Sequence, residues 1–308
     1  MTLKHIAYID LPPHAKRGGF DHAAIHCGIG RLYLAHTAND SLDVIDCREN
    51  RYLHSVPDLP GIAGVLVSED QNLIFTSNRG ENTVGILSAA TGDLLEQVRV
   101  GIGPNGLAYD PGRRLLLAAN VGDPAIPGSH TVSMVDVGAR TLLGYVPVSG
   151  RTRWAIFDAG TEAFCVNIAD PPEIAVIEAK LPDHVHRTFR VPATGPHGLD
   201  LDARTRRLFC ACDGRALVTL DAKDGRILSQ VELGGGPDVI FFNAALGHLY
   251  VAIGDPGMIE VFETETMRRF QVLQTERGAH TIAFDPTRNI VYAFLPETHR
   301  AAIYRDGG

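Results

Sequence analysis

One plan underlies two distant stretches of the chain, GPNGLAYDPGRRLLLAANVGDP (residues 103–124) and GPHGLDLDARTRRLFCACDGRALVTLD (residues 195–221). Each stretch opens with Gly-Pro-x-Gly and continues as a short apolar run. A polar turn follows, and a second apolar run ends in small or polar residues. Short apolar runs separated by Gly, Pro, Asn and Asp are typical of β-strands joined by tight turns. The two stretches therefore predict the same antiparallel unit.

Seven segments of the chain follow this plan. Their equivalent positions, one in each repeat, are 41 to 49 residues apart, and the longest step contains an insertion, GDPAIPGSHT, at residues 122–131. A period near 42 residues with about four strands per unit is the signature of propeller blades. We therefore predict an all-β fold, a seven-bladed β-propeller forming a single domain over residues 1–308. The equivalent positions are His22, Ala63, Asn105, Trp154, His197, Asp238 and His280.

The two ends of the chain complement each other. The last repeat ends at AAIYRDGG (residues 301–308), which leaves no room for an outermost strand. The N-terminal segment KHIAYIDLP (residues 4–12) resembles the outer strands of the other repeats. We expect it to complete the last blade, because closing the ring removes exposed sheet edges.

The repeats resemble those of the YVTN β-propeller family. The residues that carry the resemblance are RLYLAHTANDSLDVID (residues 31–46), NLIFTSNRGENTVGILSAATGDLLEQVRVGIGPNGLAYDP (residues 72–111) and RRLLLAANVGD (residues 113–123). It extends over about residues 4–305 and implies the propeller fold. The family includes lactonases, lyases, haem-associated propellers and proteins without known activity. It therefore assigns no catalytic residue to this chain.

The charge, the apolar stretches and the cysteines of the chain argue against several classes of protein. The formal net charge is −8 and there is no run rich in Lys or Arg, which argues against a nucleic-acid partner. No apolar stretch approaches the length of a membrane span, and the N-terminus lacks the features of a secretory signal. The five cysteines have no disulfide-framework spacing, so we expect a cytoplasmic protein with free thiols. We expect Cys210 and Cys212, on one strand, to face opposite sides.

In a propeller, equivalent positions form rings around the channel mouth. Four consecutive blades, the fifth, sixth, seventh and first, contribute His197, Asp238, His280 and His22. Imidazole and carboxylate groups together are ligands that divalent transition metals accept. The arc predicts a divalent metal site of unspecified identity. The alternative is that these side chains are hydrogen-bonded channel linings that face water or a ligand.

A second ring follows the second strand of each repeat. His36 occupies this place in the first blade, where it could act as a further ligand or a general base. Three asparagines, Asn78, Asn120 and Asn167, occupy it in the next blades. Together with Asn105 they are candidates for substrate binding. The alternative for the three is capping of the turn by side-chain hydrogen bonds to the backbone.

Four more residues are expected to reach this mouth: Arg79, Arg153, Asp255 and Glu297. Arg79 and Arg153 could hold a carboxylate by bidentate contacts. Glu297 could be a general base or support His280. For each of these, a surface ion pair is the alternative. Trp154, the only tryptophan, could stack on a ligand or plug the channel.

These residues favour a cytosolic enzyme for a small, anionic substrate. Its reaction would be that of a lyase or a lactone or ester hydrolase, with the metal polarising a carbonyl or activating a water or a substrate hydroxyl. Two alternatives stay open: a non-catalytic binding or scaffold propeller, and a metal-independent lactonase that uses His and Arg. The oligomeric state is left open.

Overall fold

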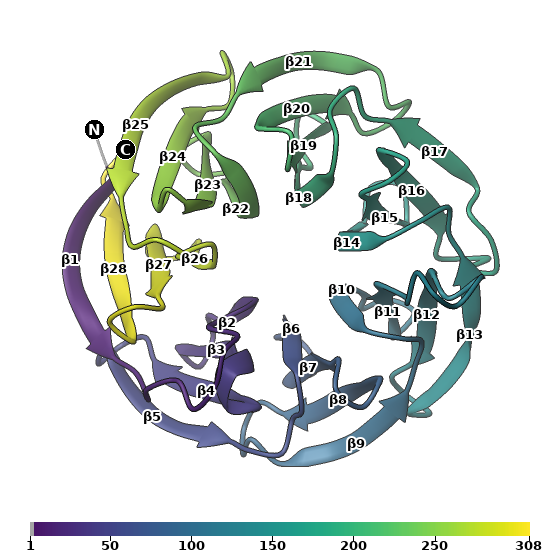
Figure 1. Cartoon of the computed structure of the whole chain (residues 1–308), viewed down its shortest axis with the longest axis horizontal. Helices are drawn as coiled ribbons and strands as arrows, with labels where there is room; N and C mark the ends of the chain where they lie inside the picture. The colour runs from purple at the N-terminus through teal and green to yellow at the C-terminus, as the bar shows by residue number, and fades with distance from the viewer. Residues whose placement is uncertain (1–2) are drawn as a thin grey trace.

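Seven four-stranded antiparallel sheets stand in a ring, one sheet per predicted blade, in the computed structural model, which describes residues 3–308 (Figure 1). The predicted seven-bladed β-propeller is confirmed. Strands follow one another from the centre of the ring outward in each blade, so consecutive strands pair as hairpins. The insertion at residues 122–131 forms the long connection between the second and third strands of the third blade.

The strand bounds show the repeat directly. Blades one to three contain β2 (Ala23–His26), β3 (Arg31–His36), β4 (Ser41–Asp46), β5 (Arg51–Val56), β6 (Ile62–Ser68), β7 (Leu73–Asn78), β8 (Thr83–Ser88), β9 (Leu94–Arg99), β10 (Pro104–Asp110), β11 (Leu115–Asn120), β12 (Thr131–Asp136) and β13 (Thr141–Pro147). Blades four to six contain β14 (Thr152–Asp158), β15 (Ala163–Ile168), β16 (Glu173–Glu178), β17 (Arg187–Arg190), β18 (Pro196–Asp202), β19 (Arg207–Cys212), β20 (Ala216–Asp221), β21 (Ile227–Glu232), β22 (Gly236–Asn243), β23 (His248–Asp255), β24 (Met258–Glu263) and β25 (Arg268–Gln274). One 3₁₀ turn, η1 (Thr37–Asn39), follows β3. Within residues 3–308, no helix has the length and apolar character needed to cross a bilayer.

The two ends of the chain close the ring. The last blade contains β26 (Ile282–Asp285), β27 (Ile290–Leu295) and β28 (Arg300–Asp306), and β1 (Leu3–Asp10) is its outermost strand. β1 runs antiparallel to β28, from Leu3 opposite Asp306 to Asp10 opposite Arg300. Figure 1 shows both chain ends at this blade. The expectation for the N-terminal segment is confirmed.

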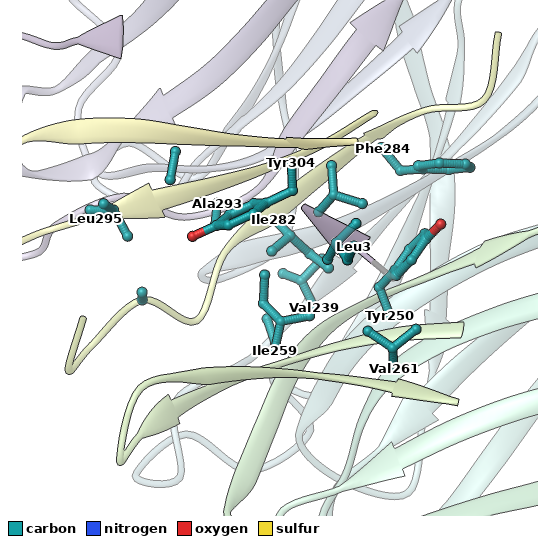
Figure 2. Packing of buried hydrophobic residues seen from close by; sticks show 14 residues of the cluster. Leu3, Val239, Tyr250, Ile259, Val261, Ile282, Phe284, Ala293, Leu295 and Tyr304 are labelled. Carbon is teal, nitrogen blue, oxygen red and sulfur yellow. The ribbon is translucent and has the colours of Figure 1, made fainter. Parts of the chain in front are cut away.

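Apolar side chains fill the spaces between neighbouring blades. Between the sixth and seventh blades, Val239, Ile259 and Tyr250 pack against Ile282 (Figure 2). Leu3 of β1 joins this cluster and is 2% exposed. The closing strand is thus held by side-chain burial as well as by its hydrogen bonds to β28.

Aspartates at the ends of innermost strands shape the turns that follow. Asp110 and Asp202 each accept two hydrogen bonds from backbone N–H groups of the next turn. Asp285 makes the same two contacts, and Asp158 makes one. Carboxylates in this position stabilise turns by replacing a backbone acceptor. These repeated aspartates therefore have a structural role in the turns.

The expectation for Cys210 and Cys212 is wrong. Residues two apart on a strand share a face, and their Sγ atoms lie 3.8 Å apart in the structure. Both side chains are fully buried. Burial raises the pKa of the Cys210 thiol well above its ordinary value, and its contact with Cys212 adds to this effect. The pair is a buried thiol contact within β19.

Substitutions of two isoleucines in β1 test whether burial of this strand stabilises the closed ring. Ile9 is 3% exposed and packs between the first and last blades, whereas Ile6 on the same strand is 42% exposed. We expect Ile9→Ala to lower the free energy of unfolding by about 2–4 kcal/mol, because a buried side chain is truncated. Ile6→Ala should change it by less than about 0.5 kcal/mol. Urea denaturation measures both, and equal effects would contradict the role given to β1.

Candidate functional site

The seven equivalent positions of the repeats form a first ring of residues around the channel. A recurring irregularity of the strands places these first-ring residues at the channel mouth. The pairing of innermost and second strands shifts register near the start of five innermost strands, as at a β-bulge. Such irregularities turn a side chain away from the regular alternation of the strand. His22 and His280 lie just before the shorter innermost strands β2 and β26. The first-ring residues within the five breaks are Ala63, Asn105, Trp154, His197 and Asp238.

Glycines beside the register breaks let neighbouring blades meet backbone to backbone. The glycine follows the first-ring residue directly in three blades and faces a carbonyl oxygen of the next blade. From an added Cβ to that oxygen, the distance would be 2.1 Å for Gly64 and Asn105, 2.4 Å for Gly106 and Arg153, and 2.3 Å for Gly198 and Asp238. A side chain does not fit at such distances. The Gly-Pro-x-Gly pattern therefore has a packing cause at its second glycine.

His197, Asp238 and His280 meet at one side of the mouth. Nε2 of His197 lies 3.1 Å from Oδ1 of Asp238, and Nε2 of His280 lies 3.9 Å from its Oδ2. Nδ1 of His197 is 2.7 Å from Oδ1 of Asp213, and Nδ1 of His280 donates to the Gly278 carbonyl at 2.8 Å. Both imidazoles are therefore held through Nδ1, and both Nε2 atoms face the same carboxylate.

His197, Asp238 and His280 are called the array below. Within it, His197 and Asp238 stabilise each other's charged form. Burial by itself would lower the pKa of His197, but Asp238 and Asp213 outweigh it and raise that pKa to about 9. Burial likewise opposes ionisation of Asp238, yet His197 and His280 bring its pKa well below the ordinary value. At neutral pH the pair is an imidazolium beside a carboxylate. His280 is the most open of the three, with 34% of its side chain exposed.

Arginines line the adjoining part of the mouth. Nη2 of Arg153 donates to Oδ2 of Asp213 at 3.2 Å, and its Nη1 lies 3.4 Å from Nε2 of His197. Nη2 of Arg79 donates to Oδ1 of Asn105 at 2.6 Å and lies 3.2 Å from a carboxylate oxygen of Asp21.

A third arginine stands near these two. Burial lowers the pKa of Arg151, and the positive charges of Arg153 and Arg79 lower it further. The three guanidinium groups thus influence one another, and the carboxylate of Asp213 acts on the pKa of Arg151 in the opposite direction.

Trp154 and His22, from the fourth and first blades, contact each other at the mouth. Their ring centroids lie 4.2 Å apart, and the indole also meets the edge of Phe241 at 6.4 Å. Burial lowers the pKa of His22, while Asp21 and Asp238 act in the opposite direction. Trp154 also lines the cavity beneath the mouth, so both roles expected for it, stacking on a ligand and plugging the channel, stay open.

The imidazole and carboxylate groups at the mouth are of the kinds that bind divalent metal ions. Among residues 3–308, no three or more His, Cys, Asp or Glu side chains already form a metal-binding group. The orientation of the imidazoles is nevertheless that of metal ligands, because a metal-bound imidazole commonly donates the N–H of its other ring nitrogen to a carboxylate or carbonyl. His197 and His280 do so. An ion there would replace the proton between His197 and Asp238. His22 is directed at Asp21, with 3.4 Å between Nε2 and Oδ1.

Several predicted residues lie outside this array. His36 is fully buried, and its Nδ1 lies 2.7 Å from Oδ2 of the equally buried Asp43. Glu297 is exposed, and no hydrogen bond or ion pair joins its carboxylate to His280 in the described part of the chain. The three second-ring asparagines are also fully buried.

The buried asparagines connect strands and blades. Nδ2 of Asn78 donates to Thr83, and Nδ2 of Asn120 donates to Thr131 and Ser133 on the neighbouring strand. Nδ2 of Asn167 donates to the carbonyls of His197 and Gly198 in the next blade. Asn167 thereby positions the backbone of His197. These contacts are structural, but they differ from the expected capping of the turn, because Asn78 and Asn120 bond to side chains and Asn167 bonds to the next blade.

Three mouth residues were not predicted from the sequence. Asp213 follows Cys212, the same place that Arg79 takes after Asn78, so the repeat alignment contained its signal. Asp21 precedes His22 and Arg151 lies two residues before Arg153, but neither position carries a recurring pattern. Their roles depend on side-chain contacts that the repeat does not specify.

Comparison with known proteins supports the fold alone. No protein-family profile matches the chain, and no curated protein matches its sequence. The YVTN resemblance is therefore not confirmed at the level of the family. Among solved structures, 1815 chains match, so the shared architecture is too common to indicate a function.

Two of the matching structures illustrate this breadth. A chain of the hydrazine synthase of Kuenenia stuttgartiensis superposes with a TM-score of 0.83 at 12% identity, over 96% of this chain and 98% of that one. A chain of a mitotic checkpoint complex superposes with a TM-score of 0.83 at 11% identity, over 99% of this chain and 92% of that one. An enzyme and a checkpoint assembly thus share this architecture.

A glycine pair tests the packing that places the mouth. We expect Gly198→Ala to destabilise the protein by about 1–3 kcal/mol, because the new methyl group meets the Asp238 carbonyl. Gly144→Ala on the outer strand β13 is the matched control, since nothing lies within 4 Å of its added Cβ. Thermal and urea unfolding measure both variants. A Gly198→Ala protein as stable as Gly144→Ala would contradict the close approach.

Proposed function

We propose that this propeller is an enzyme that acts on a small anionic substrate at the channel mouth, as a lactone or ester hydrolase or as a lyase. The observation that carries the proposal is the convergence of two imidazole Nε2 atoms on Asp238. Two imidazoles directed at one carboxylate are suited to moving protons.

The surroundings of His280 and His197 give each of them a different role in the proposed reaction. His280 donates its Nδ1–H to the carbonyl of Gly278, which leaves Nε2 as the nitrogen whose lone pair can act as a general base. His197, held as an imidazolium by Asp213 and Asp238, supplies positive charge where a carbonyl oxygen becomes negative. In hydrolysis, His280 would take a proton from water as the water adds to the carbonyl. The same proton would then go to the departing alkoxide.

The arginines support the choice of an anionic substrate. Arg79 and Arg153 keep part of each guanidinium group at the mouth, with 37% and 19% of their side chains exposed. A guanidinium group binds a carboxylate through two parallel hydrogen bonds. A substrate carboxylate held there would place the reacting group beside His197 and His280.

A metal-dependent version is the second candidate. It is favoured by the Nδ1 contacts of His197 and His280, which leave both Nε2 atoms directed at Asp238. In this version His197, Asp238 and His280 hold a divalent ion, with His22 as a further donor, and the ion supplies Lewis-acid chemistry to the substrate carbonyl. We also propose a cytoplasmic location, which five free cysteines support.

Variants of the array test the proposed function. A panel of carboxylate-bearing lactones, aryl esters and lyase substrates is assayed with the parent protein, Asp238→Asn and His280→Gln. Both variants should lower kcat/KM by about a hundredfold or more, since each removes a proton-transferring or charge-stabilising group.

A second histidine–aspartate pair provides the matched control. Nδ1 of His248 lies 2.7 Å from Oδ2 of Asp306, so this pair resembles His197 and Asp213 in geometry. His248→Gln should keep the parent rate on the panel. Equal rates for the parent and both array variants would contradict the proposal and favour a binding propeller.

Elemental analysis separates the two versions of the proposal. About one equivalent of metal in untagged parent protein, absent from a His197→Ala/His280→Ala variant, would establish the metal-dependent version. Catalysis by metal-free protein that survives dialysis against a chelator would establish the version that uses His and Arg alone.

A further inference from the structure

The channel beneath the mouth is a separate cavity. It has a volume of about 770 Å³ and is lined by residues of the innermost strands and of the turns that follow them. Trp154 and His22 stand at one end, and Glu69, Asp70 and Pro286 belong to turns at the other. The cavity volume is in the range of small-molecule sites.

The wall of this cavity is mostly apolar and rich in aromatic rings. Tyr109, Trp154, Phe157, Phe241 and Phe242 all contribute to it. Aromatic faces attract cations as well as apolar groups, because the ring carries negative charge above its plane. The wall is thus suited to an apolar molecule with a positive charge.

One carboxylate stands in this wall without a positive partner. Oδ2 of Asp200 accepts the backbone N–H of Phe242 at 2.7 Å, and Oδ1 accepts that of Leu201 at 2.8 Å. Within residues 3–308, no Lys, Arg or His side chain forms an ion pair with Asp200, and only burial and two backbone N–H groups act on its carboxyl group. Each oxygen keeps acceptor capacity for one more donor. Burial raises the pKa of Asp200 to about 6, against the effect of the two N–H groups.

The remaining charges of the lining are also negative, and no Lys or Arg belongs to it. Two of these acidic groups already have partners. Asp158 is paired with Arg206, and Glu69 accepts the N–H groups of Cys27 and Gly28. Asp200 is therefore the group that a ligand charge would meet inside the channel.

We propose that the channel binds a small organic cation, a primary ammonium with an aromatic or aliphatic body, with its charge on Asp200. The ammonium donates to the two carboxylate oxygens, and the body lies among the aromatic rings below Trp154. This site does not depend on the function proposed for the mouth. His22 and Trp154 line the cavity, whereas His197, Asp238 and His280 do not.

The single tryptophan provides a direct readout, because Trp154 lines the cavity and no other indole contributes to the fluorescence. The probes are 2-phenylethylammonium, its neutral analogue 2-phenylethanol and the anion 3-phenylpropionate. We expect the cation to change the fluorescence saturably and to bind about tenfold more tightly than the alcohol. The anion should bind more weakly than both.

Two variants test whether Asp200 is the carboxylate that binds the ammonium group. Asp200→Asn should bring the affinity for the cation down to that for the alcohol, while Asp70→Asn, at the exposed rim, should leave it within about twofold. The affinities of the cation and the alcohol are also compared in the parent protein. That comparison tests the proposal even if Asp200→Asn does not fold. Equal affinities in the parent, no saturable change up to about 10 mM cation, or equal losses in both variants would overturn the proposal.

Discussion

The structure depends on how closely the innermost strands of neighbouring blades approach one another. Gly64, Gly106 and Gly198 each face a carbonyl oxygen of the next blade at a distance that excludes a Cβ atom. This contact sets the spacing of the blades and hence the size of the ring. Three first-ring residues, Ala63, Asn105 and His197, directly precede these glycines, so the same contact helps to place them at the mouth.

The two ends of the channel differ in chemistry although the blades repeat. At the mouth, His197, Asp238 and His280 form a charged array beside arginine side chains. Below the contact between His22 and Trp154, the wall becomes apolar and acidic. The repeat supplies equivalent backbone positions, and the residues placed there give each end its character. This explains how a shared architecture can serve unrelated functions.

Much of the fold could be predicted from the sequence, because the repeat period and turn residues are local signals. The blades, the insertion in the third blade and the closure by β1 all follow from them. The repeat also predicted that His197, Asp238 and His280 share one mouth.

The remaining site details depend on side-chain contacts between blades, which no local pattern records. Asp213 supports His197 from the end of β19, and Asn167 bonds to the backbone of the next blade. His36 lies at a second-ring position, yet its partner Asp43 holds it in a buried pair. The faces of Cys210 and Cys212 were predicted wrongly, because the alternation of a strand places residues two apart on one face.

The central claim is that His197 and Asp238 act as one charged unit at the mouth. A titration of the His197 imidazole by ¹⁵N NMR, in the parent protein and in Asp238→Asn, tests it most directly. The account predicts a pKa near 9 in the parent, which falls toward 6.5 when the carboxylate is removed. A value at or below 6.5 in the parent, or one that Asp238→Asn leaves unchanged, would contradict it.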